Sequence, residues 1–284
     1  EPDAASRSRS ALRRMQMVFQ SPEASLNPRR TVAEALERPL RVLAGLDRRA
    51  ARTRALALLD AVRLPASYLN RYPGELSGGE KQRVAIARAF AAGPDLVICD
   101  EPLSSLDASV QGALMNLLVD LQDQEGTSYL FISHDLAAVQ HLSHFIGVMY
   151  LGRIVEQGRT DKVLAPPYHP YTEALVSAVP VPDPSACAHR VPLRTDVGGG
   201  SPVLSGCRFH ARCPRSLGEL CVREEPPWRL DDGGVVPAGA PAADAVAAGA
   251  PHAVRCHIAL GELAALQEET ERTRADSRCA GDAP

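Results

Sequence analysis

The chain has 284 residues, of which 45% are apolar and 23% charged, and its formal net charge is −3. This balance is ordinary for a globular protein and argues against a polyanion-binding class of protein. No apolar run approaches the roughly 20 residues of a membrane-spanning helix, and the polar N-terminus lacks the apolar core of a signal peptide. We therefore expect a cytoplasmic protein with reduced cysteines that meets a membrane only through a partner.

The first helices are predicted by their capping residues and apolar stripes. Residues 31–64 are rich in helix-forming residues, and Thr31 followed by Glu34 resembles a capping box, in which each side chain satisfies a backbone N–H of the other residue. A further helix is expected from residue 108, with leucines on one stripe, and Gly126 should end it.

Short apolar runs predict strands between these helices. Residues 96–99 and 129–132 read as buried parallel strands, each followed by polar residues. Residues 146–156 read as a β-hairpin around Leu151 and Gly152. Strands that alternate with helices predict an open α/β sheet, whose ligands bind at the carboxyl ends of the strands.

The composition of the chain changes near Ala165, after which proline and glycine are frequent and periodicity is weak. We expect a first domain over residues 1–160 and a small, irregular extension over 161–284. Within the extension, 230–251 should be loose because it is rich in Ala, Gly and Pro, and 261–273 could form a charged amphipathic helix.

A serine and two glycines open one of the predicted helices. Ser77, Gly78 and Gly79 stand at the start of that helix, where exposed backbone N–H groups and the positive end of the helix dipole favour an anion. Taken alone, these residues fit a glycine-containing helix cap equally well.

Two carboxylates follow the strand at 96–99. Asp100 at the strand end can hold Mg²⁺ through water, and Glu101 can polarise an attacking water as a general base. The alternative is an acidic turn after a core strand. His134 follows the next strand and Gln20 precedes the other motifs, and each alone fits an ordinary polar residue of a loop.

In this order and at this spacing, the motifs over about residues 15–160 resemble the ATPase domain of ABC transporters, a P-loop NTPase-like α/β fold that uses ATP and Mg²⁺. The resemblance implies that Gln20 is the Q-loop glutamine, which senses Mg²⁺ and water and faces the membrane partner. The segment Ser77-Gly78-Gly79 would be the signature motif, which binds the γ-phosphate of ATP held by the opposite subunit.

The remaining roles come from the same resemblance. Asp100 would be the Walker B aspartate, Glu101 the general base, Asp107 the D-loop residue and His134 the switch histidine.

The family also requires a Walker A motif, G-x-x-x-x-G-K-[ST], whose backbone and lysine hold the phosphates. The sequence does not contain it, since neither of the two lysines, Lys81 and Lys162, follows a glycine. We expect a fragment with a truncated N-terminus, whose own site is inactive and whose sheet is partly uncovered. The alternative is a degenerate subunit that does not hydrolyse ATP and lends its signature motif to a partner's site.

The subfamily is indicated after the ATPase core. The segment Tyr168-His-Pro-Tyr-Thr172, the proline-rich stretch that follows it, and the segment 20–28 resemble oligopeptide, dipeptide and nickel importer ATPases. The resemblance implies a second ATPase subunit in a homo- or heterodimer, two transmembrane permeases and an extracytoplasmic solute-binding protein. The chain would lie on the cytoplasmic face of the membrane, without nucleic acid. Peptide, nickel or another small solute stays open.

Four cysteines in the extension, Cys207, Cys213, Cys221 and Cys256, suggest a metal or iron–sulfur site more than disulfides. Zinc is the metal that four thiolates usually bind, whereas the resemblance favours a [4Fe–4S] cluster. The third alternative is that the thiols bind nothing. Outside this set, Cys99 should be a buried strand thiol, and the two remaining cysteines, Cys187 and Cys279, should be spare.

Two other classes of protein remain as alternatives. A soluble ABC ATPase of DNA repair or translation shares the signature motif but should lack both the segment 168–171 and the four cysteines. A non-enzymatic regulatory subunit is supported only by the missing phosphate loop, whereas intact Glu101 and His134 argue against it.

Overall fold

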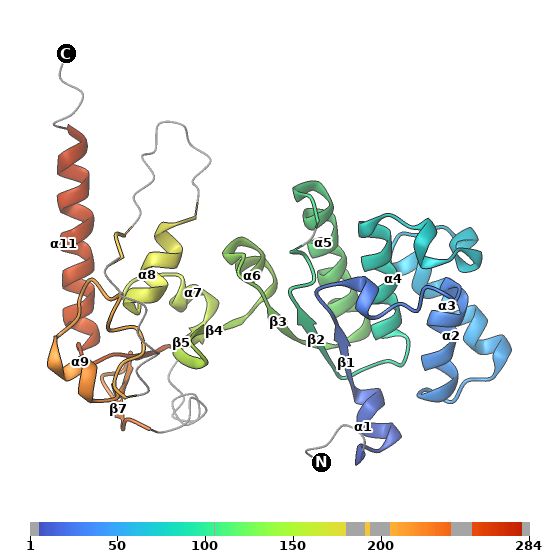
Figure 1. Ribbon diagram of the computed structural model, residues 1–284, viewed down its shortest axis with the longest axis horizontal. Coiled ribbons are helices and arrows are strands. Elements are labelled where there is room, and N and C mark those ends of the chain that lie inside the picture. The colour runs from blue at the N-terminus through green and yellow to red at the C-terminus, as the bar shows by residue number, and fades with distance from the viewer. Residues whose placement is uncertain (1–5, 105, 180–190, 194–204, 240–251, 280–284) are drawn as a thin grey trace. The chain divides into compact units, whose positions relative to one another are not determined.

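The computed structural model describes residues 6–104, 106–179, 191–193, 205–239 and 252–279. The chain divides into two compact units, Glu1–Leu142 and Ser143–Pro284 (Figure 1). In the described part of the chain, none of the helices combines the length and the apolar character that crossing a membrane requires.

The first unit alternates helices with the strands of one sheet. In chain order its elements are α1 (Arg9–Arg14), β1 (Met15–Val18), η2 (Pro22–Ala24), α2 (Val32–Val42), α3 (Arg48–Ala61), η3 (Ala66–Asn70), η4 (Pro73–Glu75), α4 (Gly78–Phe90), β2 (Leu96–Asp100), α5 (Ala108–Glu125), β3 (Ser128–Ile132) and α6 (Leu136–Leu142). The α/β class expected from the sequence is confirmed.

The sheet of the first unit is parallel, in the order β1-β2-β3. Val97 and Cys99 of β2 are fully buried on one face, where they belong to the same core as Leu114 and Leu118 of α5. Phe90 of α4 meets Tyr129 of β3 edge to face, with ring centroids 6.1 Å apart. The helices thus cover one face of the sheet, and the apolar run at 96–99 is the buried parallel strand that the sequence predicts.

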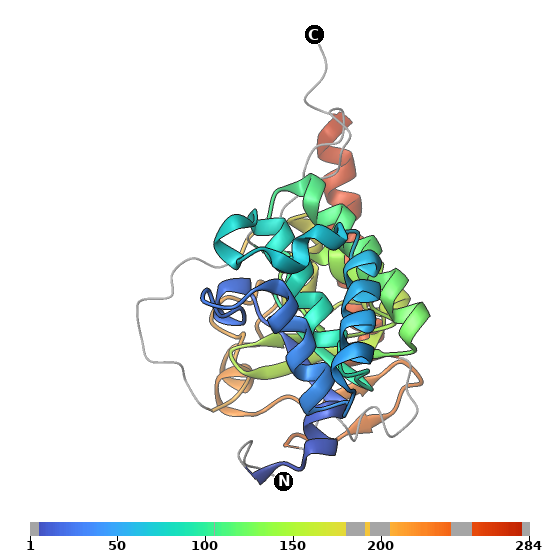
Figure 2. The same cartoon turned by 90° about the vertical axis from the view of Figure 1, so that its right-hand side faces the viewer.

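The helices α2, α3 and α4 pack against one another (Figure 2). Thr31 begins α2 with the predicted capping box, in which the Thr31 N–H donates to Glu34 Oε2 at 3.0 Å and the Glu34 N–H donates to Thr31 Oγ1 at 3.3 Å. Gly126 ends α5 in the left-handed conformation, with a φ of 63°, as predicted.

The other face of this sheet exposes apolar side chains. Met17, Ile98 and Leu130 lie in one row across the three strands, on the face opposite to Val97 and Cys99. Leu130 is 52% exposed, and Ile132, two residues further along β3, is 45% exposed. Parallel sheets normally have both faces covered, so this face is suited to receive further polypeptide.

The second unit is built around an antiparallel sheet of order β4-β5-β8-β6-β7. Its elements are β4 (Phe145–Tyr150), β5 (Arg153–Arg159), α7 (Thr160–Val163), α8 (Pro170–Ser177), α9 (Glu219–Arg223), β6 (Trp228–Leu230), β7 (Val235–Val236), β8 (His252–Arg255) and α11 (Leu260–Cys279). The hairpin predicted at 146–156 and the helix predicted at 261–273 are both present, and each is longer than predicted.

The structure differs from the sequence prediction at two places in this unit. The compact units divide after Leu142 rather than near residue 160, because β5 pairs with β8 and so draws the hairpin into the C-terminal unit. Part of the stretch 230–251 is ordered, since Val235 and Val236 pair with β6. The turn that allows this pairing contains Gly233 with a φ of 86°, a turn signal that the composition of the stretch obscured. Residues 240–251 lie outside the described part.

Candidate functional site

The carboxyl ends of the three parallel strands bring predicted site residues together. Gln20 follows β1, Glu101 follows β2 and His134 follows β3. The Gln20 Nε2 atom donates to Glu101 Oε2 at 3.1 Å, and His134 Nδ1 lies 3.3 Å from Glu101 Oε1. Each oxygen of the Glu101 carboxylate therefore has a partner from a neighbouring strand end, and we call these three residues the strand-end cluster.

The backbone fixes Glu101 in an uncommon conformation. Its φ of 42° lies in the left-handed region, which costs a residue other than glycine of the order of 1–3 kcal/mol. The Glu101 N–H donates to the Ile132 carbonyl at 3.0 Å, and the Ser104 hydroxyl donates to the Glu101 carbonyl at 3.1 Å. Strained backbone held by neighbouring bonds is common at functional sites.

The side chains of Glu101 and His134 in the strand-end cluster face the surface. Asp100, next to Glu101, lies on the face of the sheet that the helices do not cover. Glu101 is 30% exposed and His134 is 74% exposed, so both are open to a ligand or a partner. Asp100 pairs in register with Ile132 on the open face of the sheet, because it alternates with the buried Cys99.

The predicted signature segment begins α4. The Glu80 N–H donates to Ser77 Oγ at 3.4 Å, and the Ser77 N–H donates to Glu80 Oε2 at 2.8 Å, which completes a capping box. The first N–H groups of a helix have no partner within it, so the amides of Gly78 and Gly79 are available to an anion at the positive end of the helix dipole.

Packing of α4 against α5 explains one of the two glycines. A Cβ atom built on Gly79 would lie 2.9 Å from Val110 Cγ1, whereas a Cβ atom on Gly78 would lie 3.9 Å from Leu106 Cδ2. Only glycine lets the start of α4 approach α5 this closely, so the two helix N-termini are neighbours.

Asp107 caps the second of these helices. Its Oδ1 atom accepts from the Val110 N–H at 3.0 Å and from the Ser109 hydroxyl at 2.7 Å. These bonds, the Ser109 hydroxyl first, lower the pKa of the Asp107 carboxyl. Leu106, the residue before Asp107, approaches Gly78, so the start of α5 lies beside the signature segment.

Some residues of the site were missed in the sequence. Ser104 accepts from Gln20 Nε2 at 3.4 Å, and the Tyr68 hydroxyl donates to Glu80 Oε1 at 2.6 Å. Tyr68 lies in the 3₁₀ helix η3, outside all predicted motifs, and no local pattern marks it. Glu80 carried a usable signal, since a serine followed three residues later by glutamate is a capping box.

The four cysteines of the extension lie close enough together in the second unit to influence one another's pKa. The Cys207 N–H donates to the Cys221 carbonyl at 2.8 Å. Burial, with a smaller contribution from neighbouring thiols, raises the pKa of Cys213 to about 12 and that of Cys256 to about 11. Over the described residues, however, no three Cys, His, Asp or Glu side chains are grouped as metal ligands. The arrangement therefore does not fit the predicted iron–sulfur or zinc centre.

Of the other three cysteines, only the side chain of Cys99 lies in the described part of the chain. Cys99 is a buried strand thiol as predicted, and burial raises its pKa to about 12. Cys187 and the side chain of Cys279 lie outside the described residues.

The segment 168–173, singled out in the sequence, is buried and anchors the second unit. The His169 side chain is fully buried, which lowers its pKa to about 3, and its Nδ1 atom accepts from the Tyr171 N–H at 3.1 Å. The His169 N–H donates to Glu156 Oε2 at 2.9 Å, and Glu156 Oε1 lies 2.7 Å from His252 Nε2. His169 is thus a core residue that caps α8 and joins it to β5.

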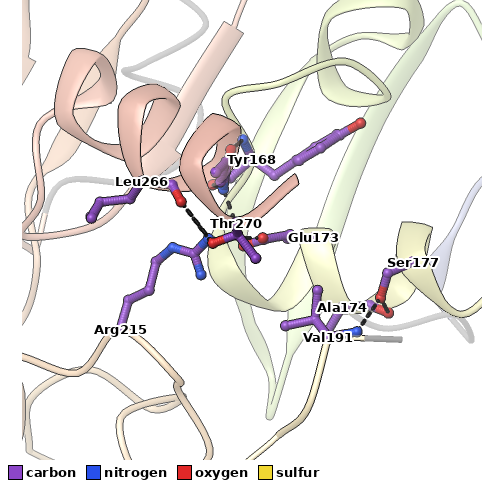
Figure 3. A network of polar contacts seen from close by, with 9 residues as sticks. Tyr168, Glu173, Ala174, Ser177, Val191, Arg215, Leu266 and Thr270 are labelled. Carbon is purple, nitrogen blue, oxygen red and sulfur yellow. Dashed lines mark hydrogen bonds and ion pairs between the residues drawn. The ribbon is translucent and has the colours of Figure 1, made fainter. Parts of the chain in front are cut away.

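A buried ion pair joins α8 to α11 and to residues 205–223, which contain Cys207, Cys213 and Cys221 and are called the cysteine segment (Figure 3). Arg215 lies 2.9 Å from Glu173, and the two side chains are 11% and 9% exposed. Arg215 also donates to Thr270 Oγ1 at 3.2 Å, and Gln267 pairs with both backbone polar atoms of Tyr168 at 2.9 Å. These bonds fasten the C-terminal helix to the segment 168–173.

Comparison with known protein families agrees with this geometry. The family "ABC transporter" matches residues 2–104, and the family "Oligopeptide/dipeptide transporter, C-terminal region" matches residues 155–221. The solved structure of cbiO1 from Clostridium perfringens, part of the ABC transporter complex cbiONQ, is 28% identical with a TM-score of 0.50. The match covers 54% of this chain and 60% of that one.

Curated relatives give the same assignment. A peptide import ATP-binding protein of Brucella ovis is 46% identical over 76% of this chain and 68% of its own length. A peptide ABC transporter ATP-binding protein of Sinorhizobium fredii is 49% identical over 76% of this chain and 61% of its own length. The dipeptide transport ATP-binding protein DppF of Escherichia coli is 44% identical over 75% and 64%, respectively.

The chain belongs to the ATP-binding proteins of ABC transporters, in the oligopeptide/dipeptide group. It spans between 61% and 66% of the length of the first three curated relatives that it matches. The match to the C-terminal region of the group argues against the alternative of an ABC ATPase of DNA repair or translation.

Proposed function

We propose that the chain is an ATP-binding, energy-coupling part of an ABC importer for peptides. The observation that carries the proposal is the strand-end cluster, in which Gln20 and His134 hold the two carboxylate oxygens of Glu101. A carboxylate held at a strand end by an amide and an imidazole is suited to orient and deprotonate a water. The relatives named for peptide and dipeptide transport support peptides as the solute, with nickel or another small solute as the alternative.

Each site residue has a proposed role. Glu101 is the general base, Gln20 senses Mg²⁺ and the attacking water, and His134 fixes the carboxylate and the γ-phosphate. Asp100 holds Mg²⁺ through water, and this role is supported by its place at the end of β2 on the open face of the sheet.

The start of α4 binds a phosphate in the proposed mechanism. The amides of Gly78 and Gly79, together with Ser77, bind the γ-phosphate of an ATP molecule whose other phosphates are held by a second ATPase subunit. Asp107 holds the start of α5 beside this segment, and its bond to the Val110 N–H supports that role. The proposed reaction is phosphoryl transfer to water, which depends on positioning and charge neutralisation.

The phosphate loop in this proposal comes from polypeptide outside these 284 residues, since they do not contain G-x-x-x-x-G-K-[ST]. The open apolar face at Leu130 and Ile132 supports a site that is completed by a further strand and helix. We therefore propose that the chain alone does not hydrolyse ATP. Its proposed partners are a second ATPase subunit, two permeases and an extracytoplasmic solute-binding protein, on the cytoplasmic face of a membrane.

The test is ATP turnover by the chain mixed with the N-terminal phosphate-loop segment of a family member, which supplies the strand and helix that the open face of the sheet lacks. Glu101→Gln should lower the turnover of the mixture at least about 100-fold, because general-base catalysis contributes 10²–10⁴-fold. Glu125→Gln is the matched control. It makes the same chemical change at a carboxylate that pairs with Arg54 at 2.7 Å, far along α5, and it should leave turnover unchanged. Equal turnover of the two variants would contradict the role of Glu101.

A second candidate is a subunit that only donates its signature segment, favoured by the missing phosphate loop. In that case turnover in a mixture with a complete family member depends on Ser77-Gly78-Gly79 but not on Glu101. The Glu101→Gln variant would then match the wild type, whereas a bulky substitution at Ser77 would abolish turnover.

The iron–sulfur or zinc centre predicted from the spacing of the four cysteines is not part of the proposed function. The thiol arrangement described above does not form a ligand set. Iron, sulfide and zinc analysis of protein purified without oxygen tests it. Substoichiometric metal in every preparation would rule the centre out.

A further inference from the structure

The carboxylate of Glu80 is held at both of its oxygens beside the start of α4. Oε2 accepts from the Ser77 N–H at 2.8 Å, and Oε1 accepts from the Tyr68 hydroxyl at 2.6 Å. The guanidinium of Arg71 lies over the Tyr68 ring, 3.9 Å from its centroid. A tyrosine of η3 and an arginine after it thus support one residue of the first turn of α4.

This support matters because Glu80 is negatively charged. The helix N-terminus beside it attracts any anion, whether a phosphate or the carboxylate of its own first turn. A carboxylate free to rotate could bind the amides of Gly78 and Gly79 itself and repel a phosphate. In the structure one oxygen of Glu80 is taken by the Ser77 N–H and the other by Tyr68.

We propose that Tyr68 is a positioning residue of the signature segment, which holds Glu80 in its capping role and keeps the Gly78 and Gly79 amides open to a phosphate. This inference rests on the proposed function, because it assumes that α4 receives the γ-phosphate. Tyr68 acts through Glu80 and does not itself contact the nucleotide.

The electrostatics of the three residues agree with this role. The Tyr68 hydroxyl bond, followed by the Ser77 N–H and with a smaller contribution from the charge of Arg71, lowers the pKa of the Glu80 carboxyl. The same hydrogen bond is the main cause of the raised pKa of Tyr68. Glu80 therefore remains a carboxylate that is satisfied by Tyr68 and the helix cap.

The first experiment is a carbon-13 NMR titration of the Glu80 carboxyl in the full chain. Tyr68→Phe removes one oxygen and keeps the ring under Arg71, and it should raise the pKa of Glu80 toward the ordinary value for glutamate. Tyr129→Phe is the matched control, because it removes a tyrosine hydroxyl that donates to the Leu118 carbonyl at 2.8 Å elsewhere in the same unit. An unchanged Glu80 titration in Tyr68→Phe would overturn the proposal.

The second experiment measures ATP turnover of the chain assembled with a subunit that carries the phosphate loop. Tyr68→Phe should raise the KM for ATP about tenfold, since hydrogen bonds to charged groups are worth about that factor or more. It should leave kcat nearly unchanged, because the strand-end cluster is intact. Adding Glu80→Gln to Tyr68→Phe removes the competing charge and should return KM toward the wild-type value.

The outcomes separate this inference from the proposed function. A shifted Glu80 titration, a raised KM and rescue by Glu80→Gln support the role of Tyr68. A KM that stays the same in Tyr68→Phe, or a double variant without rescue, overturns it. An assembly of wild-type chain without any ATP turnover would instead contradict the proposed function, and the role of Tyr68 would then be decided by the Glu80 titration and by phosphate-induced shifts of the Gly78 and Gly79 amides.

Discussion

The close approach of α4 to α5 gives a prediction that can be worked from one distance. In Gly79→Ala, the new Cβ would lie 2.9 Å from Val110 Cγ1, about 0.6–1.1 Å closer than the usual 3.5–4.0 Å between carbon atoms. Val110 is restricted to one rotamer in a helix, so its side chain cannot rotate away to relieve the clash. Overpacking of this kind costs about 1–3 kcal/mol.

The higher helix propensity of alanine partly offsets the cost of this clash. The substitution Gly78→Ala serves as the control for this propensity effect. Replacing glycine by alanine within a helix gains at most about 1 kcal/mol, so Gly79→Ala should lower the free energy of unfolding by up to about 2 kcal/mol. Gly78→Ala, whose Cβ would be 3.9 Å from Leu106, should be neutral or slightly stabilising.

Urea unfolding followed by far-UV circular dichroism measures both variants. The expected difference in unfolding free energy between Gly78→Ala and Gly79→Ala is about 1–3 kcal/mol. In a Val110→Ala background the difference should largely disappear, since the clashing methyl groups are gone. Equal stability of the two alanine variants in the wild-type background would refute the packing explanation for Gly79.

Three further predictions concern the second unit. Burial lowers the pKa of His169 to about 3 in the folded chain, whereas an exposed histidine has a pKa of about 6.5, so the unfolded state binds more protons below pH 6.5. The free energy of unfolding should therefore fall by roughly 1.4 kcal/mol by pH 5.5 and continue to fall toward pH 3. His169→Asn, which keeps a capping acceptor, should remove this part of the slope in urea unfolding at several pH values, and an unchanged slope would contradict it. Arg215→Met should cost about 3–5 kcal/mol in the same assay, because it leaves Glu173 buried without its partner, and adding Glu173→Gln should recover part of the loss; a cost below about 1 kcal/mol would show the pair to be dispensable. Gly206→Ala should disorder the cysteine segment, since its Cβ would lie 2.5 Å from the Cys221 carbonyl oxygen, and thiol labelling should become faster than in the wild type; unchanged labelling would count against this contact.

Local chemistry in the sequence predicted much of the first unit. The capping box at Thr31, the apolar run at 96–99 and the glycine at 126 each act over a few residues, and each was confirmed. The proximity of Glu101 and His134 also followed from local patterns, because each follows a predicted parallel strand and such strands place their carboxyl ends at one edge of a sheet. Gln20 was assigned only by the family resemblance, since the strand before it, β1, was not predicted.

Features that depend on distant partners could not be read from the sequence. Tyr68 reaches Glu80 only because η3 packs beside α4, and β5 pairs with β8 across a long stretch of sequence. The division of the units after Leu142 follows from that pairing. The spacing of the cysteines, similarly, predicted a ligand set that the described structure does not form.

The most direct test is to label the chain with an ATP analogue that carries a photoreactive group on the γ-phosphate. With a partner subunit that supplies the phosphate loop, the label should attach to residues 76–80 of this chain, and Glu101→Gln should not prevent it. Without the partner, the same residues should remain unlabelled. Labelling of the partner's phosphate loop alone, with residues 76–80 untouched in the mixture, would contradict a nucleotide shared between the two polypeptides.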